Sequence, residues 1–159
     1  AYCNGEMVSF LLGCSFSFER ALLEAGLPIR NMEEGKNVSM YITNRACVAA
    51  GPFHTPMVVS MRPMTSGQAV RAAQITTRFE RTHGAPIHWG DPEILGIRNL
   101  DEPDFGDAVT LHPGEIPVFW ACGVTSALAA TSAALPLVIT HAPGHMFISD
   151  LRDEEMTLF

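Results

Sequence analysis

The feature that most constrains the fold is an apolar segment that runs into a glycine, a helical segment and a second apolar segment. Residues 116–121 are strongly apolar, Cys122-Gly123 follow, residues 125–134 are rich in alanine, and residues 135–141 are apolar again. Two apolar strands separated by one helix are typical of a parallel β-α-β unit with a right-handed crossover. We therefore expect an α/β fold, with a mixed sheet that carries this parallel unit at its C-terminal end and helices packed on it.

The remaining elements are predicted from the spacing of apolar residues. The predicted helices cover residues 4–12, 17–25 and 66–81, and the predicted strands cover residues 38–43 and 57–61. The third helix has the clearest start, because Thr65 and Gln68 have the spacing of a capping box.

Residues 83–117 have a different character, with five prolines and five glycines between short apolar pieces. An irregular stretch of this length is uncommon in a compact domain unless it has a function. Short strands joined by tight turns are the alternative. Residues 37–100 are a candidate α+β subdomain within a single domain that covers residues 1–159.

Composition excludes several classes of protein. The net charge is −7 and Lys36 is the only lysine, whereas nucleic-acid binding needs a clustered basic face. A phosphate-binding loop is absent, and Lys36 lies in a polar turn that is a poor place for a Schiff base. The apolar runs are shorter than the ~20 residues of a membrane span. We expect neither a nucleic-acid nor a membrane partner.

The four cysteines are widely spaced, at positions 3, 14, 47 and 122. Their spacing contains no C-x-x-C pair, and a chain of this length does not need disulfides to hold a core. We interpret them as reduced thiols, which indicates a cytoplasmic protein.

The Cys122-Gly123 turn is the first candidate for chemistry. A strand that ends there and enters a helix presents free backbone N–H groups, which together with the helix dipole bind carboxylate or phosphate. Cys122 could act as a nucleophile whose pKa the dipole lowers, or it could be a buried packing residue. We expect this turn, with Gly123 and Thr125 as substrate contacts, to form the floor of the main pocket.

Two histidine-containing loops are the second candidate. His88 and Asp91 lie in the irregular stretch, and His141 and His145 follow the last predicted strand. Ligands of parallel α/β sheets bind at the carboxyl ends of strands, and a histidine there can act as a general base near neutral pH. We predict that these four residues approach the pocket, and that His83 caps the preceding helix instead.

Each histidine has structural alternatives. A hydrogen-bonded structural role is common for a single histidine. The same side chains could also ligate a metal, although their spacing matches no zinc signature such as H-E-x-x-H. We predict no metal and no organic cofactor.

Ser60 and Arg62 lie at the end of an apolar strand and are the third candidate. A guanidinium pairs bidentately with a carboxylate, so both residues are predicted to contact substrate. An internal ion pair between Arg62 and one of the seventeen acidic residues is the alternative.

Seven segments, in collinear order, resemble the D-glutamate cyclase family. They are residues 13–19, 40–44, 59–63, 83–92, 103–107, 118–125 and 141–151. Members of the family carry a further N-terminal segment, so the chain resembles their C-terminal two thirds. They also continue Cys-Gly-Val-Thr with Pro-Gln, where this chain has Ser126-Ala127.

The resemblance implies a hydro-lyase that removes water from D-glutamate to give 5-oxo-D-proline without a cofactor. The reaction needs a base, donors for a developing oxyanion and a carboxylate clamp. The expected partner is a small amino acid or carboxylate, and a homo-oligomer is an open possibility. Two alternatives remain: a non-catalytic or truncated domain that binds a small carboxylate, and a metal-dependent hydrolase that uses the His/Asp loops.

Overall fold

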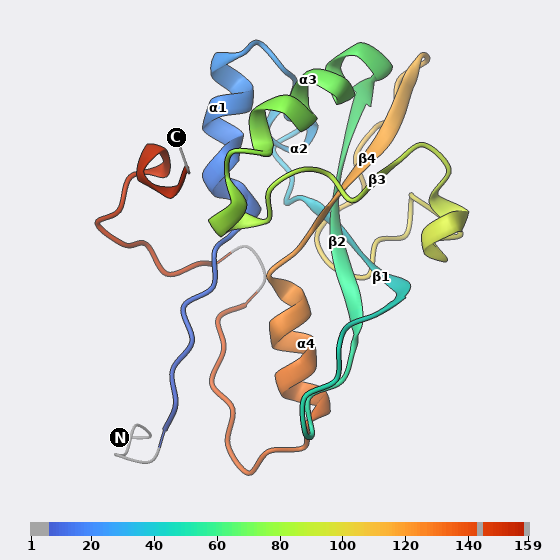
Figure 1. Ribbon diagram of the computed structural model, residues 1–159. Helices are drawn as coiled ribbons and strands as arrows, with labels where there is room; N and C mark the ends of the chain where they lie inside the picture. Colours follow the sequence, from blue (N-terminus) through green and yellow to red (C-terminus); the bar gives the residue numbers. More distant parts are fainter. Residues whose placement is uncertain (1–6, 143–144, 158–159) are drawn as a thin grey trace.

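The computed structural model describes residues 7–142 and 145–157 (Figure 1). Its α-helices are α1 (Glu19–Glu24), α2 (Arg30–Glu33), α3 (Ser66–Thr76) and α4 (Val124–Ser132). Its strands are β1 (Ser39–Ala46), β2 (Pro56–Thr65), β3 (His88–Trp89) and β4 (Glu115–Ala121). Short 3-10 turns cover Ser15–Phe18, Glu80–Thr82, Pro92–Leu95 and Asp153–Met156. In the part of the chain described here, no helix is both long and apolar enough to cross a membrane.

The four strands form one sheet in the order β1-β2-β4-β3, and every neighbouring pair is antiparallel. Strand β2 is central, and it pairs with β4 along the whole length of β4, with Ser60 opposite Trp120 and Arg62 opposite Val118. This pairing places the C-terminal end of β4 beside the first half of β2. The sheet and the helices on it give a mixed α and β architecture (Figure 1).

The predicted parallel β-α-β unit is wrong. Strand β4 and helix α4 form as expected, but residues 135–142 form no strand. Because β2 and β3 pair with the two edges of β4, neither edge is free for a parallel partner beside it. Apolar side chains of this segment, such as Leu137 and Ile139, are about half exposed.

The first predicted helix is also absent over residues 7–12, and residues 4–6 lie outside the described part. Val8, Phe10 and Leu11 are at least 75% exposed, so no core surface is available to them. A helix this short is marginal without such packing.

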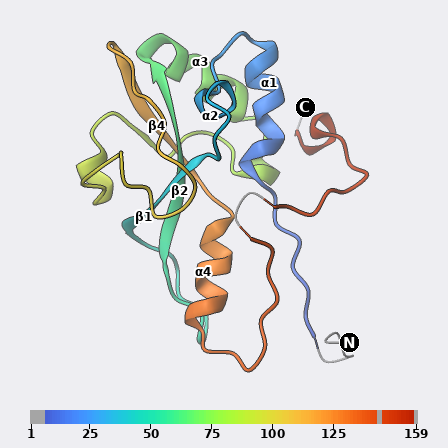
Figure 2. The same cartoon turned by 180° about the vertical axis from the view of Figure 1, so that it is seen from behind.

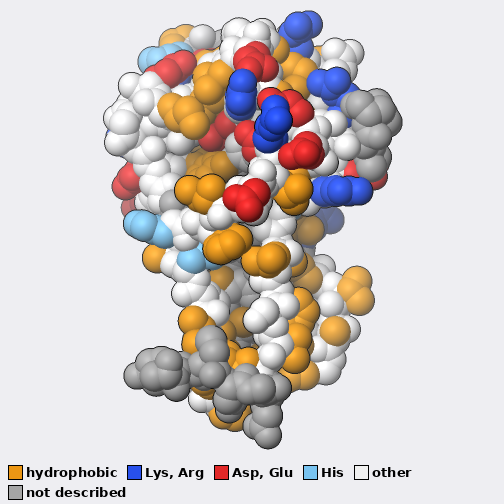
Figure 3. Space-filling model, turned by 90° about the vertical axis from the view of Figure 1, so that its left-hand side faces the viewer, with side chains coloured by type: hydrophobic (Ala, Val, Ile, Leu, Met, Phe, Trp, Pro, Cys, Tyr) orange, Lys and Arg blue, Asp and Glu red, His pale blue; other side chains and the backbone are white. Residues whose placement is uncertain are grey.

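In Figure 3 charged side chains gather on the upper part of the molecule, and hydrophobic ones predominate in the lower part.

Several local predictions are confirmed. The capping box at α3 is present, with the Thr65 backbone N–H donating to Gln68 Oε1 at 2.9 Å and the Gln68 N–H donating to Thr65 Oγ1 at 3.4 Å. Helix α3 ends at Thr76, however, and not near Arg81. The second predicted helix corresponds to a 3-10 turn followed by α1, and the chain reverses at Gly26, whose φ is +73°.

The core lies on both faces of the sheet. Alternate β4 residues point to opposite sides, so Val118 and Trp120 pack with Phe18, Leu22 and other residues of the helical side. Figure 2 shows the irregular stretch (yellow) beside β1 and β2.

On the other face, Phe119 packs with Tyr41 and with Leu95, Ile97 and Val109 from the irregular stretch. The glycine- and proline-rich stretch therefore covers one face of the sheet. Gly106 permits its close approach, since a Cβ atom there would lie 1.9 Å from the Val38 carbonyl oxygen.

Candidate functional site

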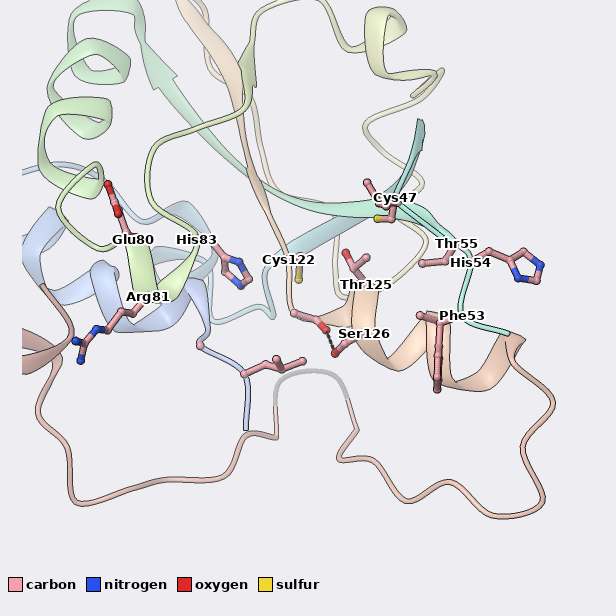
Figure 4. Close-up of a pocket in the computed structure, with 15 residues that line it drawn as sticks. Cys47, Phe53, His54, Thr55, Glu80, Arg81, His83, Cys122, Thr125 and Ser126 are labelled. Carbon is pink, nitrogen blue, oxygen red and sulfur yellow. Dashed lines mark hydrogen bonds between the residues drawn. The ribbon is translucent and has the colours of Figure 1, made fainter. Parts of the chain in front are cut away.

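A cavity of about 440 Å³ opens at the C-terminal end of β4, where the strand turns into α4 (Figure 4). Four stretches of chain meet around it: the N-terminal segment, the β1–β2 hairpin, the turn after α3, and the β4–α4 turn with the first half of α4. The lining residues are 12, 13, 47, 48, 53–55, 80, 81, 83, 122, 123, 125, 126 and 129. Cys122 and Gly123, which we expected to form the floor of the main pocket, are among these lining residues.

The β4–α4 turn is held in place by strand β2. The Cys122 N–H donates to the Val58 carbonyl at 3.0 Å, and the Val58 N–H donates to Thr125 Oγ1 at 2.9 Å. The Thr125 hydroxyl, predicted to bind substrate, therefore positions the turn. Helix α4 begins after Gly123 without a side-chain cap, and Gly123, Thr125 and Ser126 place the start of the helix, with the positive end of its dipole, in the cavity wall.

Cys122 is a poor candidate nucleophile in this setting. Its side chain is almost buried, and its Sγ lies 3.6 Å from Met40 Sδ. Burial raises the pKa of the Cys122 thiol, and a hydrogen bond from the Val124 N–H opposes the rise only in part. The group is therefore a thiol near neutral pH, whereas the thiolate is the reactive form.

His83 is the C-cap of the 3-10 turn Glu80–Thr82, but it also lies in the wall of the cavity, so the prediction that it lies apart from the pocket is wrong. Its backbone has φ +83°, a left-handed conformation that few residues other than glycine adopt. Its Nε2 atom is buried and has no hydrogen-bond partner among the described residues. Burial, and secondly the Arg62 guanidinium, lower the pKa of His83. In the sequence, only the position of His83 in the irregular stretch of residues 83–117 indicated that it could lie at a functional site.

Ser60 and Arg62 belong to a buried network behind the cavity. The Arg62 guanidinium, which is 0% exposed, donates to Glu19 Oε1 from Nε at 3.0 Å and from Nη2 at 2.5 Å. It also donates to Ser60 Oγ and Ser15 Oγ. The structure therefore shows the internal ion pair, and not the predicted contact surface for a carboxylate ligand.

Aromatic rings enclose this network. The Arg62 guanidinium carbon lies 5.3 Å from the ring centroid of Phe18 and 5.5 Å from that of Trp120. Both rings attract the cation through their π faces. Arg62 is thus a fixed positive charge inside the protein, and it acts on the cavity by lowering the pKa of His83 in the cavity wall.

His88 and Asp91 are adjacent but do not line this cavity. His88 Nε2 lies 2.8 Å from the Asp91 carbonyl oxygen, and its ring stacks on Phe119 at a centroid distance of 6.0 Å. The Asp91 carboxylate accepts the Glu93 N–H at 3.0 Å and so begins a 3-10 turn. The structure gives both residues local structural contacts at β3.

His141 and His145 lie beyond α4 and are exposed. His141 Nδ1 is 2.7 Å from the Ala142 carbonyl, and the His145 N–H donates to that same carbonyl at 3.0 Å. Neither is among the described residues that line the cavity. Among all residues placed by the structure, no three His, Cys, Asp or Glu side chains gather in a group that could hold a metal ion.

Comparison with known proteins identifies similar chains. A family model described as D-glutamate cyclase matches residues 8–150. A relative from Syntrophobacter fumaroxidans is 64% identical over 153 residues, which cover 96% of this chain and 59% of the relative. One from Rubrobacter xylanophilus is 60% identical over 152 residues, covering 96% and 59%. One from Bacillus subtilis is 57% identical over 157 residues, covering 99% and 61%.

These three relatives carry the name "putative hydro-lyase". The chain spans about six tenths of the length of the curated relatives it matches.

Proposed function

The chain belongs to the D-glutamate cyclase family, and on that premise we propose that it is a hydro-lyase whose substrate binds in the cavity at the end of β4. The substrate class is a small amino acid or a related carboxylate, and the specific reaction is the dehydration of D-glutamate to 5-oxo-D-proline. The observation that carries the proposal is the cavity itself, which is lined by the uncapped start of α4 and by the half-buried His83, whose Nε2 atom has no partner among the described residues.

The proposed reaction is an intramolecular condensation. The amine nitrogen bonds to the γ-carboxyl carbon while one carbon–oxygen bond of that carboxyl group breaks. The two protons lost by the ammonium nitrogen leave with the departing oxygen as water, so no oxidant or reductant takes part. The protein has to take up a proton, stabilise negative charge on oxygen and return a proton to the leaving oxygen.

The β4–α4 turn fits the second of these tasks. The Thr125 and Ser126 N–H groups donate to the Cys122 and Gly123 carbonyls, so the contribution of α4 is the positive end of its dipole, which stabilises negative charge that develops in front of it. Gly123 leaves space for a ligand between the start of α4 and His83, because a Cβ atom at this position would lie 4.0 Å from His83 Nε2. A volume of about 440 Å³ is within the range of small-molecule sites.

The catalytic residues predicted from sequence are revised accordingly. Cys122 and Gly123 stay in the proposal as the floor of the site, and Thr125 as the residue that positions it. Ser60 and Arg62 become buried supports, and His88, Asp91, His141 and His145 have no assigned step.

Incubation of the purified protein with D-glutamate tests the proposal. We expect 5-oxo-D-proline to accumulate with loss of one water per molecule, as measured by chiral chromatography and mass spectrometry, and L-glutamate to react more slowly. A parallel incubation with EDTA tests for metal dependence. Binding of D-glutamate without turnover would instead favour a carboxylate-binding domain, and no binding would refute both functions.

A further inference from the structure

We propose that His83 is the general base of this cavity, and that its Nε2 atom takes the proton from the substrate's ammonium nitrogen. The inference rests on the proposed hydro-lyase function and assigns a residue to its first step.

The first support is the backbone of His83. His83 occupies the left-handed C-cap position of the turn Glu80–Thr82, with φ +83°, where glycine is the usual residue, and a non-glycine residue in this conformation tends to persist where the surrounding structure holds it for a function. Here the Thr82 and Gly84 N–H groups both donate to the Phe79 carbonyl, at 2.8 Å and 3.0 Å. These two bonds hold the turn on either side of His83.

The second support is the unpaired Nε2 atom. Buried polar atoms nearly always have hydrogen-bond partners, and an exception calls for an explanation. The His83 Nε2 atom is buried without a partner in the described structure. It faces the start of α4, since a Cβ atom on Gly123 would lie 4.0 Å from it (Figure 4). A substrate in this space would lie between His83 and the start of α4, with its amine toward the imidazole and its carboxylate toward the positive end of the helix dipole.

The third support is the charge around the imidazole. The Arg62 guanidinium of β2 acts on the imidazole. The other ionisable residues that line the same cavity are Cys47 and His54 of the β1–β2 hairpin, Glu80 and Arg81 of its own turn, and Cys122 after β4. The buried Arg62 cation and the loss of solvent both lower the pKa of His83. The imidazole is therefore neutral at physiological pH, which is the form that accepts a proton.

Two substitutions remove the imidazole without removing the turn. Glycine adopts positive φ freely, and asparagine is among the residues that tolerate it, so His83→Gly and His83→Asn should fold. We expect each to lower kcat/KM by about 10²-fold or more. Added imidazole should restore part of the turnover of His83→Gly, where a space is left, and none of the turnover of His83→Asn. His112→Gln, an exposed histidine at the other end of β4, should retain wild-type turnover.

The pH dependence gives a second readout. In the wild type we expect kcat/KM to fall at low pH with a midpoint equal to the His83 pKa, measured by NMR of the imidazole protons. That pKa should lie below 6.5, the ordinary value for a histidine side chain. A purely structural role would not tie the two midpoints together or allow imidazole to rescue His83→Gly.

The outcomes separate the two proposals. An active wild type with an equally active His83→Asn overturns the base assignment and leaves the hydro-lyase function intact. Loss of turnover in folded His83→Gly without rescue by imidazole also overturns it. A wild type with no turnover refutes the hydro-lyase function, and the assignment of His83 falls with it.

Discussion

The buried Arg62–Glu19 pair allows a quantitative prediction for Glu19→Gln. The two side chains are 0% and 3% exposed and share two hydrogen bonds. The substitution preserves shape but leaves the Arg62 cation without a counter-charge. Removing one partner of a buried ion pair costs about 3–5 kcal/mol, against a total stability of about 5–15 kcal/mol for a typical domain. With a urea m-value of about 2 kcal/mol/M, the unfolding midpoint should fall by roughly 2 M.

Glu24→Gln is the matched control, because it changes the same residue type in the same helix. Glu24 accepts a hydrogen bond from Arg20 at 2.9 Å, but both side chains are more than 60% exposed. An exposed pair of this kind contributes little to stability because solvent screens it, so the unfolding midpoint of Glu24→Gln should barely move. Urea unfolding followed by tryptophan fluorescence measures both variants, since Trp120 packs over the guanidinium.

A double variant separates the pair from the lone charge. Replacing both partners by apolar residues, as in Glu19→Leu with Arg62→Met, leaves no buried charge and should recover most of the stability lost in Glu19→Gln. Equal midpoints for Glu19→Gln and Glu24→Gln would refute the reasoning, because they would show that Arg62 is hydrated or paired elsewhere. A double variant less stable than Glu19→Gln would contradict it as well.

Three further predictions concern the cavity floor, a close backbone contact and pH. Gly123→Ala should keep the free energy of unfolding or raise it by up to about 1 kcal/mol, because the new methyl group makes only ordinary contacts. The same methyl group should displace the substrate and lower kcat/KM about tenfold or more. The control Gly67→Ala, in open space on α3, should leave kcat/KM unchanged. Gly13→Ala should destabilise the fold by about 1–3 kcal/mol, since its Cβ would lie 2.1 Å from the Arg81 carbonyl oxygen, and an unchanged thermal midpoint would contradict that contact. Hydrogen bonds, above all from Lys36, lower the pKa of Glu34 from 4.5 to about 2. The ionised Glu34 side chain therefore stabilises the fold fully above pH 4.5, and this stabilisation is lost as the pH falls toward 2. Glu34→Gln should flatten the plot of urea midpoint against pH between these values, and an unaltered plot would exclude Glu34 as the source of the slope.

Local features of the chain were readable from sequence. The α3 capping box, the reversal at Gly26 and the passage from β4 through Gly123 into α4 depend on side chains a few residues apart. Neighbour-to-neighbour sterics and hydrogen bonds determine such features, so they hold in almost any tertiary context. The same local character places Cys122 and Gly123 at the end of β4, where they line the cavity.

Strand pairing was decided by the tertiary structure. The apolar pattern of residues 116–121 indicated a buried strand but not its neighbours, and both edges of β4 are occupied by antiparallel partners. Residues 135–142 therefore have no edge beside β4 to join. Apolar composition favours burial in general, whereas a strand needs a particular unpaired row of backbone groups.

The candidate site shows the same division. The types of residue were visible in the sequence, but any of seventeen acids could have paired with Arg62, and the partner is 43 positions away. The sequence indicated only that His83 caps the preceding helix. In the structure, Gly13 packs the N-terminal segment against the Arg81 carbonyl, and this segment forms one side of the cavity that His83 lines. Sequence determined local features such as the α3 capping box and the turn from β4 into α4, because those depend on residues close together in the chain. Tertiary structure decided which charges are buried together and which imidazole is left unpaired, because burial and pairing depend on contacts between distant parts of the chain.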